Sequence, residues 1–548
     1  MLTAPRGVTA LARRGRELRE WLLQGPSRSV WSVALVGFFV SASLTITQGF
    51  PSSPSIHDEF SYLLSGDTFA HGRLTNPTHP MWRHFETFHV IQVPTYSSKY
   101  PPAQGLVLAA GQLLGDPVVG VWLSYALMGA AFTWMLQAWV GARWALYGGL
   151  GTAIWLGGSH AAEAYWATSY WGGAVAATGG ALVLGGVRRL AIRPTVAASL
   201  ATGAGIAVLA NSRPFEGLLF SVVPAVVVTW TLVRQLRSRL WRAVGTTLAP
   251  MTLLLATAAV MMGLHNHAVT GSATVPPYTE HEGQYASSPT VLGQSIPERP
   301  QYRVAVIEQF YVNGNGVAVP FRNLPEFFSM LRRDGPQLLG FYVPFFVAPL
   351  LLALPWAARN RWMFIALACL TTTGIGVAVN LYAWKAHYAA PAAAAWCILL
   401  AESARLASQV RWRNRNLGRT AAQLVGLFLV LSFGMQGAIL FVVRDNRATE
   451  WHRVRQATER RLASSGDHLI LVEYGPRHLP DWEWVYNRAD IDGSPIVWAR
   501  SLGEPQDAAL REYFATRTQW RLYVDDDKGP FDLTPLSEAL RGQRPATR

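Results

Sequence analysis

Two adjacent carboxylates, Asp58 and Glu59, follow shortly after the first long apolar run of the chain, which ends at Phe50. A carboxylate that is partly desolvated at a membrane surface can act as a general base toward a hydroxyl or an amine, a role worth about 10² to 10⁴ in rate. The pair also suits the start of a helix, with Asp58 as the N-cap and Glu59 in the first turn. These two residues alone leave both interpretations open.

Cations and other polar groups that could act beside such a base stand at the ends of later apolar runs. Lys99 and Tyr100 precede a Pro-Pro pair that stiffens the chain, and a phosphate group could bind there. Arg213 ends another apolar run, where an ionisable group is costly unless a phosphate or Glu216, three residues on, pairs with it. The predicted substrate-binding residues are Lys99, Tyr100, Glu163, Arg213, Glu216, His265, Lys385, His387 and Tyr388. As an alternative, several of them could simply anchor the chain at the membrane interface.

The first loop is rich in histidine, which raises the question of a metal. Its five histidines are His57, His71, His79, His84 and His89. No two of them have the i, i+3 or i, i+4 spacing of a ligand pair on one helix, so no metal ligands are predicted and a divalent cation remains an alternative. In the second loop, Glu280, His281 and Glu282 could shape a cleft for an acceptor or belong to an irregular lid.

The composition indicates what kind of scaffold must position these residues. Half of the 548 residues are hydrophobic and 15% are charged, against about 25% in a typical soluble domain. The formal net charge is +14, but the basic residues stand in short patches between apolar runs rather than on one soluble module, which argues against a nucleic-acid partner. Both cysteines, Cys369 and Cys397, fall inside apolar runs and predict no disulfide.

About eleven apolar runs are long enough to cross a bilayer core of about 30 Å. They lie near 30–50, 117–138, 144–158, 166–187, 195–211, 215–233, 243–264, 338–356, 362–380, 388–404 and 420–443. Arginine patches within 6–28, 188–193, 234–242, 359–361 and 405–419 all fall on one side of this arrangement. Because short loops rich in arginine stay in the cytoplasm, the N-terminus is expected inside and the C-terminus outside.

The chain therefore divides into three parts. Residues 1–29 form a basic cytoplasmic tail, and 30–443 form an all-α polytopic membrane domain with long outer loops at 51–116 and 265–337. Residues 444–548 predict a small α/β domain outside the cytoplasm, with strands at 468–474, 495–500 and 520–524 and a helix near 507–514.

The Asp-Glu pair after the first span, the Lys-Tyr-Pro-Pro element that closes the first outer loop and the many-span body together resemble the GT-C class of integral membrane glycosyltransferases. The similar branches are the protein O-mannosyltransferases, the aminoarabinose transferases acting on lipid A, and the transferases of lipopolysaccharide cores. The resemblance implies that Asp58 is the catalytic base with Glu59 as its companion. It also implies a polyprenyl-phosphate sugar as donor and an envelope lipid, glycan or protein as acceptor.

Such a transfer would take place at the outer face of a bacterial inner membrane, among membrane lipids. A single displacement at the sugar C1 inverts its configuration, and Arg213, Lys385 or Lys99 would stabilise the leaving phosphate. The alternatives are a transporter or flippase of lipid-linked sugars, a non-catalytic envelope assembly protein, and a ligase that uses a pyrophosphate carrier. A transporter is expected to carry ionisable groups near the middle of its spans and a structural repeat, and neither is evident in the sequence.

Overall fold

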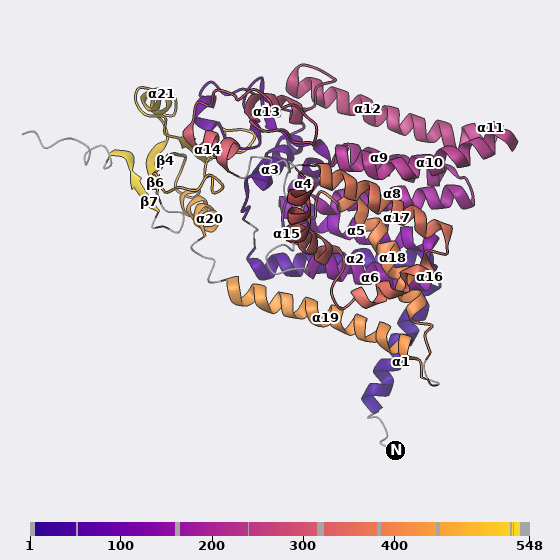
Figure 1. The fold of residues 1–548 in the computed structure, drawn as a ribbon. Helices are drawn as coiled ribbons and strands as arrows, with labels where there is room; N and C mark the ends of the chain where they lie inside the picture. The colour runs from indigo at the N-terminus through magenta and orange to yellow at the C-terminus, as the bar shows by residue number, and fades with distance from the viewer. Residues whose placement is uncertain are drawn as a thin grey trace, which may run out of the picture.

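The computed structural model describes residues 6–537 apart from 51–52, 159–164, 239, 315–322, 381–384, 412, 414, 445–449, 526–528 and 530. Its main body is a bundle of roughly parallel helices (Figure 1). The principal members are α2 (Pro26–Gln48), α5 (Pro117–Trp139), α6 (Ala142–Gly158), α8 (Gly173–Ile192), α9 (Val196–Ala210), α10 (Pro214–Ser238), α12 (Ala249–Thr270), α17 (Arg361–Val379), α18 (Ala393–Ala407) and α19 (Leu417–Arg444).

Seven helices among the described residues are long and apolar enough to cross a membrane. They are Pro26–Gln48, Pro117–Trp139, Gly173–Ile192, Pro214–Arg237, Leu240–Thr270, Arg361–Val379 and Leu417–Val442. The count of eleven spans is thus not confirmed, because α6, α9 and α18 have only 17, 15 and 15 residues. The two least buried spans are Leu240–Thr270 and Leu417–Val442. In their most apolar stretches, 6% and 11% of the residues are buried inside the protein.

The apolar run at 338–356 does not form one helix, contrary to the sequence prediction. Helix α15 (Leu324–Tyr342) ends there, and a 3₁₀ turn (Ala348–Ala353) leads into the short α16 (Leu354–Ala357). Prolines 344, 349 and 355 account for the break, since each lacks the backbone N–H that a continuous helix requires. The hydropathy pattern alone does not reveal this break in the helix.

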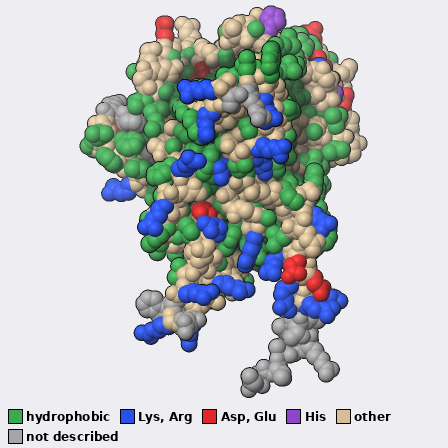
Figure 2. Space-filling model, turned by 90° about the vertical axis from the view of Figure 1, so that its right-hand side faces the viewer, with side chains coloured by type: hydrophobic (Ala, Val, Ile, Leu, Met, Phe, Trp, Pro, Cys, Tyr) green, Lys and Arg blue, Asp and Glu red, His purple; other side chains and the backbone are tan. Residues whose placement is uncertain are grey.

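The two ends of the bundle differ in charge. One end carries the basic helix α1 (Arg6–Leu23) and the arginines between spans, and Figure 2 looks onto this end, where the many basic side chains are arginines. The other end carries α3 (His57–Ala70), α4 (Pro102–Leu113), α13 (Pro277–Tyr285), α14 (Ala305–Asn313) and a small antiparallel sheet of β1 (Asn76–Pro77), β3 (Thr95–Ser98) and β2 (Val90–Ile91). The polar residues singled out in the two long loops belong to this second end, which we call the loop end.

A C-terminal α/β unit packs on the loop end. After α20 (Trp451–Leu462), a sheet forms in the order β5-β4-β6-β7, from β4 (His468–Tyr474), β5 (Ile496–Arg500), β6 (Thr518–Val524) and β7 (Asp532–Pro535). β4 pairs in parallel with β5 and β6, and α21 (Gln506–Tyr513) connects the latter two. The three strands and the helix expected from the sequence are confirmed, with β7 as an added antiparallel strand.

Contacts with the first loop fix this unit in place. The rings of Phe60 on α3 and Tyr486 stack with centroids 4.3 Å apart, and the Ala489 N–H donates to Asp67 Oδ2 at 2.8 Å. Trp484 and Trp498 are fully buried in the same apolar cluster. The C-terminal unit and the first long loop therefore share one core.

Close helix packing in the bundle leads to a test of the fold. A Cβ at Gly180 on α8 would lie 2.1 Å from the backbone oxygen of Pro391, whereas a Cβ at Gly434 on α19 meets nothing within 4 Å. We expect Gly180→Ala to destabilise the protein by about 1–3 kcal/mol through overpacking. Gly434→Ala should leave it unchanged or slightly more stable, since alanine is the better helix former. Thermal unfolding midpoints in detergent measure both, and equal midpoints for the two variants would refute this packing.

Candidate active site

Asp58 lies in the first turn of α3 with its carboxylate held between two neighbours. The Tyr100 hydroxyl donates to Asp58 Oδ1, and His57 Nε2 lies 3.2 Å from Asp58 Oδ2. The helix begins at His57 after an extended Ile56, and no side chain caps it, so the N-cap role considered for Asp58 is wrong. The carboxylate keeps 15% of its side-chain surface exposed, which leaves room for one more partner.

Glu59 has a different environment from its neighbour. Its carboxylate accepts hydrogen bonds from the backbone N–H groups of Tyr170 at 3.0 Å and Ser55 at 2.8 Å, and the side chain is buried. Burial raises the pKa of Glu59, and the two backbone N–H groups oppose this rise. Glu59 therefore joins the entry of α3 to the segment after α7 (Tyr165–Thr168), which is a positioning role, and its catalytic role stays a prediction.

Lys99 is the buried cation of the first loop. Its Nζ lies 3.6 Å from Glu282 Oε1 and 5.0 Å from the ring centroid of Tyr278. Burial lowers the pKa of Lys99. Burial alone would raise the pKa of Glu282, but Lys99 and His281 outweigh it and lower that pKa. The second loop thus supplies the counterion of Lys99, and Asp58 is close enough to act on its charge.

Arg213 lies in the turn between α9 and α10, next to the same site. The Ala103 N–H donates to the Asn211 carbonyl at 2.9 Å, which ties this turn to the start of α4. The Arg213 guanidinium sits 5.1 Å from the ring centroid of Tyr388, and its charge acts on Tyr62 and Tyr100.

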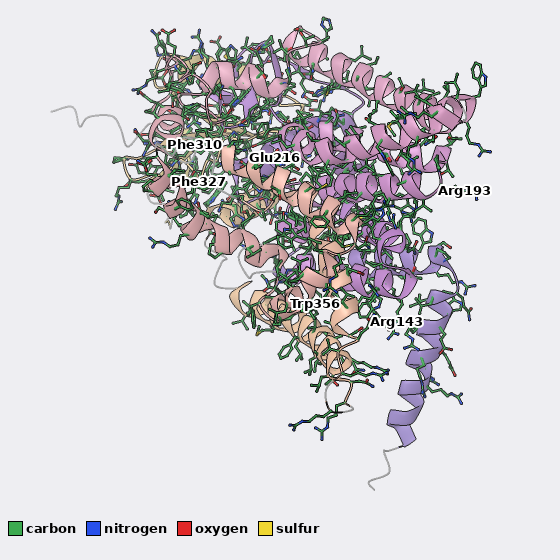
Figure 3. The ribbon with its side chains drawn as sticks, turned by 45° about the vertical axis from the view of Figure 1, so that its right-hand side comes forward. Arg143, Arg193, Glu216, Phe310, Phe327 and Trp356 are labelled. Atoms are coloured by element: carbon green, nitrogen blue, oxygen red, sulfur yellow. The ribbon has the colours of Figure 1, made fainter. Side chains whose placement is uncertain are left out.

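The internal ion pair between Arg213 and Glu216 is not formed. In the described part of the chain no carboxylate comes within ion-pair distance of the Arg213 guanidinium, and Glu216 Oε1 accepts from Asn380 at 3.3 Å instead. Figure 3 shows Glu216 inside the bundle, on the side toward Phe310 of the loop end, with Arg143 and Arg193 at the opposite end. Glu216 still acts on Arg213 through its charge, so a carboxylate lies near Arg213 without a direct ion pair.

The remaining predicted residues are distributed unevenly. His387 is buried between the rings of Trp171 and Tyr388, each with its centroid 4.3 Å away, so His387 and Tyr388 belong to the site. Lys385 is exposed and acts on His387 through its charge. Glu163 lies outside the described residues.

His265 does not join this group, contrary to the prediction. It packs against Phe69, with ring centroids 5.9 Å apart, near the far end of α3. Eleven residues separate Phe69 from Asp58, which is about 16 Å along a helix. The reason is that α12 continues to Thr270, so His265 still lies within the helix instead of opening the loop.

Tyr311 and Asp481, which the sequence did not single out, join His57, His89 and His281 at the site. The Tyr311 hydroxyl lies 3.3 Å from His281 Nε2 and 3.5 Å from His89 Nδ1, and the Asp481 charge acts on His57 from the C-terminal unit. Burial lowers the pKa of His57 and His89, and lowers that of His281 to about 4. No local pattern announces these residues, because they reach the site from separate loops.

The site offers a hydrogen-bonded carboxylate, that of Asp58, close to the two cations Lys99 and Arg213. Asp58 can accept a proton from a hydroxyl or amine, while Lys99 and Arg213 can bind an anionic group next to it. His57, Asp58 and His89 offer nitrogen and oxygen atoms within 4.8 Å of one another, a donor set that suits a metal ion. The tyrosine rings of Tyr62 and Tyr100, stacked at 4.4 Å, add an apolar wall.

No protein-family model matches the chain, and no curated protein matches it. Among solved structures, apo ArnT from Cupriavidus metallidurans is 14% identical, with 94% of this chain and 94% of that chain covered and a TM-score of 0.50. ArnT bound to undecaprenyl phosphate gives 14% identity, 90% and 92% coverage and a TM-score of 0.47. Archaeal AglB from Archaeoglobus fulgidus, in complex with an inhibitory peptide and a dolichol-phosphate, is 11% identical. That match covers 90% of this chain and 69% of AglB, with a TM-score of 0.43. The likeness to apo ArnT shows that the chain has the GT-C fold implied by the sequence resemblance.

The positioning role of Glu59 is testable by stability. Glu59→Ala leaves the buried Tyr170 N–H without an acceptor, at a cost of about 1–3 kcal/mol, and also removes the part-buried bond to the Ser55 N–H. Glu59→Gln keeps one carbonyl acceptor. We expect the unfolding midpoint in detergent to fall in the order wild type, Glu59→Gln, Glu59→Ala. An unchanged midpoint for Glu59→Ala would show that the carboxylate holds no structure.

Proposed function

We propose that the chain is an integral membrane glycosyltransferase that moves a sugar from a polyprenyl-phosphate donor to an envelope lipid, glycan or protein acceptor. The observation that carries the proposal is the convergence at Asp58. Four segments far apart in the sequence bring Asp58, Tyr100, Arg213 and Tyr388 together at the loop end of an apolar bundle. A lipid-linked phosphate lies at a membrane surface, at one end of such a bundle, and the loop end places Arg213 and Lys99 beside the carboxylate of Asp58.

In the proposed reaction, Asp58 takes the proton of the acceptor hydroxyl or amine as that group attacks the sugar C1. The C1–phosphate bond breaks, and the polyprenyl phosphate leaves with the negative charge. Arg213 and Lys99 stabilise that charge as it develops, which is the role of fixed cations in transfer reactions. Tyr100 orients the base through its hydrogen bond to Oδ1. One displacement implies inversion at C1.

The arrangement also bears on the rival functions and on topology. The charged residues of the site stand at span ends, as an interfacial enzyme requires, whereas a transporter uses ionisable groups within its spans. With the arginine-rich end in the cytoplasm of a bacterial cell, the loop end and the C-terminal unit face outward from the inner membrane. The donor, the acceptor and the surrounding lipids would then meet on the outer face.

Sugar transfer itself is the first test. Radiolabelled polyprenyl-phosphate sugars are supplied to membranes that contain wild-type protein or Asp58→Asn, and label is followed into lipid, glycan and protein fractions. We expect Asp58→Asn to lower transfer about 10² to 10⁴-fold, since the amide cannot accept the proton. Asp116→Asn is the matched control, because Asp116 caps α5 by accepting from the Val118 N–H, and asparagine caps equally well. Equal transfer by Asp58→Asn and wild type would reject the assignment of the base.

Arg213 gives a second test on the phosphate side. Arg213→Ala should lower kcat/KM about 10- to 100-fold, as expected for loss of a charged hydrogen bond worth about 1.5–3 kcal/mol. The matched control is Arg193→Ala at the opposite end of the bundle (Figure 3). If both variants reduce the rate equally, the effect comes from total charge, and Arg213 does not hold the phosphate.

A further inference from the structure

Three possible metal ligands meet beside the proposed base. His57 and Asp58 lie in the first turn of α3, and His89 directly precedes β2. Their ligand atoms all lie within 4.8 Å of one another, and the rings of His57 and His89 have centroids 4.6 Å apart. We propose that His57, Asp58 and His89 bind one divalent transition-metal ion. The role of the ion rests on the proposed function, whereas its binding does not.

The donor set selects the class of metal. Two imidazoles and one carboxylate suit Zn²⁺, Co²⁺, Fe²⁺ or Mn²⁺, while Mg²⁺ and Ca²⁺ prefer oxygen ligands only. Two ligand atoms that are each about 2.0–2.2 Å from a tetrahedral ion lie about 3.4 Å apart. The observed 3.2 Å between His57 Nε2 and Asp58 Oδ2 therefore needs little adjustment. Three protein ligands leave a position open for a substrate atom or water.

The backbone at His89 is an independent observation. Its φ is 61°, and among the described residues only His89 and Arg413 are non-glycine residues with positive φ. Such a conformation is uncommon for a non-glycine residue and persists where the surroundings over-determine it, often at ligand sites. The His89 carbonyl accepts from Ser61 Oγ at 2.6 Å and from the Lys99 N–H at 3.2 Å. Since Ser61 lies on α3, the helix that carries Asp58 also holds the strained residue in place.

The charges around the three ligands also favour a cation. The carboxylates of Asp58 and Asp481 both act on His57. Lys99 is the opposing positive charge, and Glu282 at 3.6 Å offsets it. A dication held here would add positive charge for binding a phosphate beside Arg213 and Lys99. This arrangement escaped the sequence prediction because His57 and His89 stand in different elements, so no helical ligand spacing exists.

Direct metal binding tests the proposal without any sugar transfer. Full-length protein with a histidine-free affinity tag is stripped with a chelator in detergent and then titrated with Co²⁺ alone or Zn²⁺ alone. Visible absorption reports Co²⁺, and equilibrium dialysis with metal analysis reports Zn²⁺. We expect one ion per chain, and an affinity at least about tenfold weaker in His57→Gln, Asp58→Asn and His89→Asn, given that even second-shell changes cost 10- to 100-fold. Asparagine is chosen at position 89 because it tolerates positive φ.

His71→Asn is the matched control from the same loop, because His71 is exposed and contacts Asp67 rather than the three ligands. Elution volume and metal-free unfolding midpoint check that each variant folds; if His89→Asn does not, His57→Gln and Asp58→Asn decide. Equal affinity in wild type and these variants, or no binding of either ion by wild type, overturns the proposal. Metal binding without sugar transfer would instead reject the proposed function and leave this site standing.

Discussion

The hydrogen bond from Tyr100 to Asp58 joins the two segments on which the rest of the site is built. It connects the first turn of α3 to the residues that start α4, and Ser61 repeats the connection by contacting Ser98 at 2.7 Å. Ser98 Oγ in turn accepts from the Tyr100 N–H at 3.1 Å. A carboxylate at the end of an apolar bundle needs such partners, because an unpaired buried charge is far more costly than a paired one.

The cost of leaving a buried charge unpaired also explains why distant loops converge at the site. Glu59 is satisfied by backbone N–H groups, and Lys99 by Glu282 from the second loop. Arg213 faces the Tyr388 ring, with no carboxylate at ion-pair distance in the described part of the chain. An arginine with this surrounding is suited to an anion that arrives with the substrate. Lys99 thus has a carboxylate partner from the second loop, whereas Arg213 lies against an aromatic ring.

Much of this could be read from the sequence, and the reasons for the failures are physical. Asp58 and Arg213 stood out because ionisable residues at the ends of apolar runs are costly. The strands of the C-terminal unit followed from short runs rich in strand-forming residues. Short helices were counted as spans because hydropathy measures composition, not helix length. His89, Tyr311 and Asp481 were missed as a group because tertiary folding brings them together from separate loops. The hydrogen bond between Glu59 and the Tyr170 N–H joins residues 111 positions apart, so it has no local sequence signature.

The central claim is that the loop end receives the phosphate of a polyprenyl carrier. An experimental structure of the full chain in lipid nanodiscs with a bound polyprenyl phosphate tests this most directly. The account expects the phosphate within hydrogen-bonding distance of Arg213 or Lys99, close to Asp58, with the prenyl chain running into the bilayer between helices. A phosphate bound at the arginine-rich end, or at the loop end but away from all three residues, would contradict it.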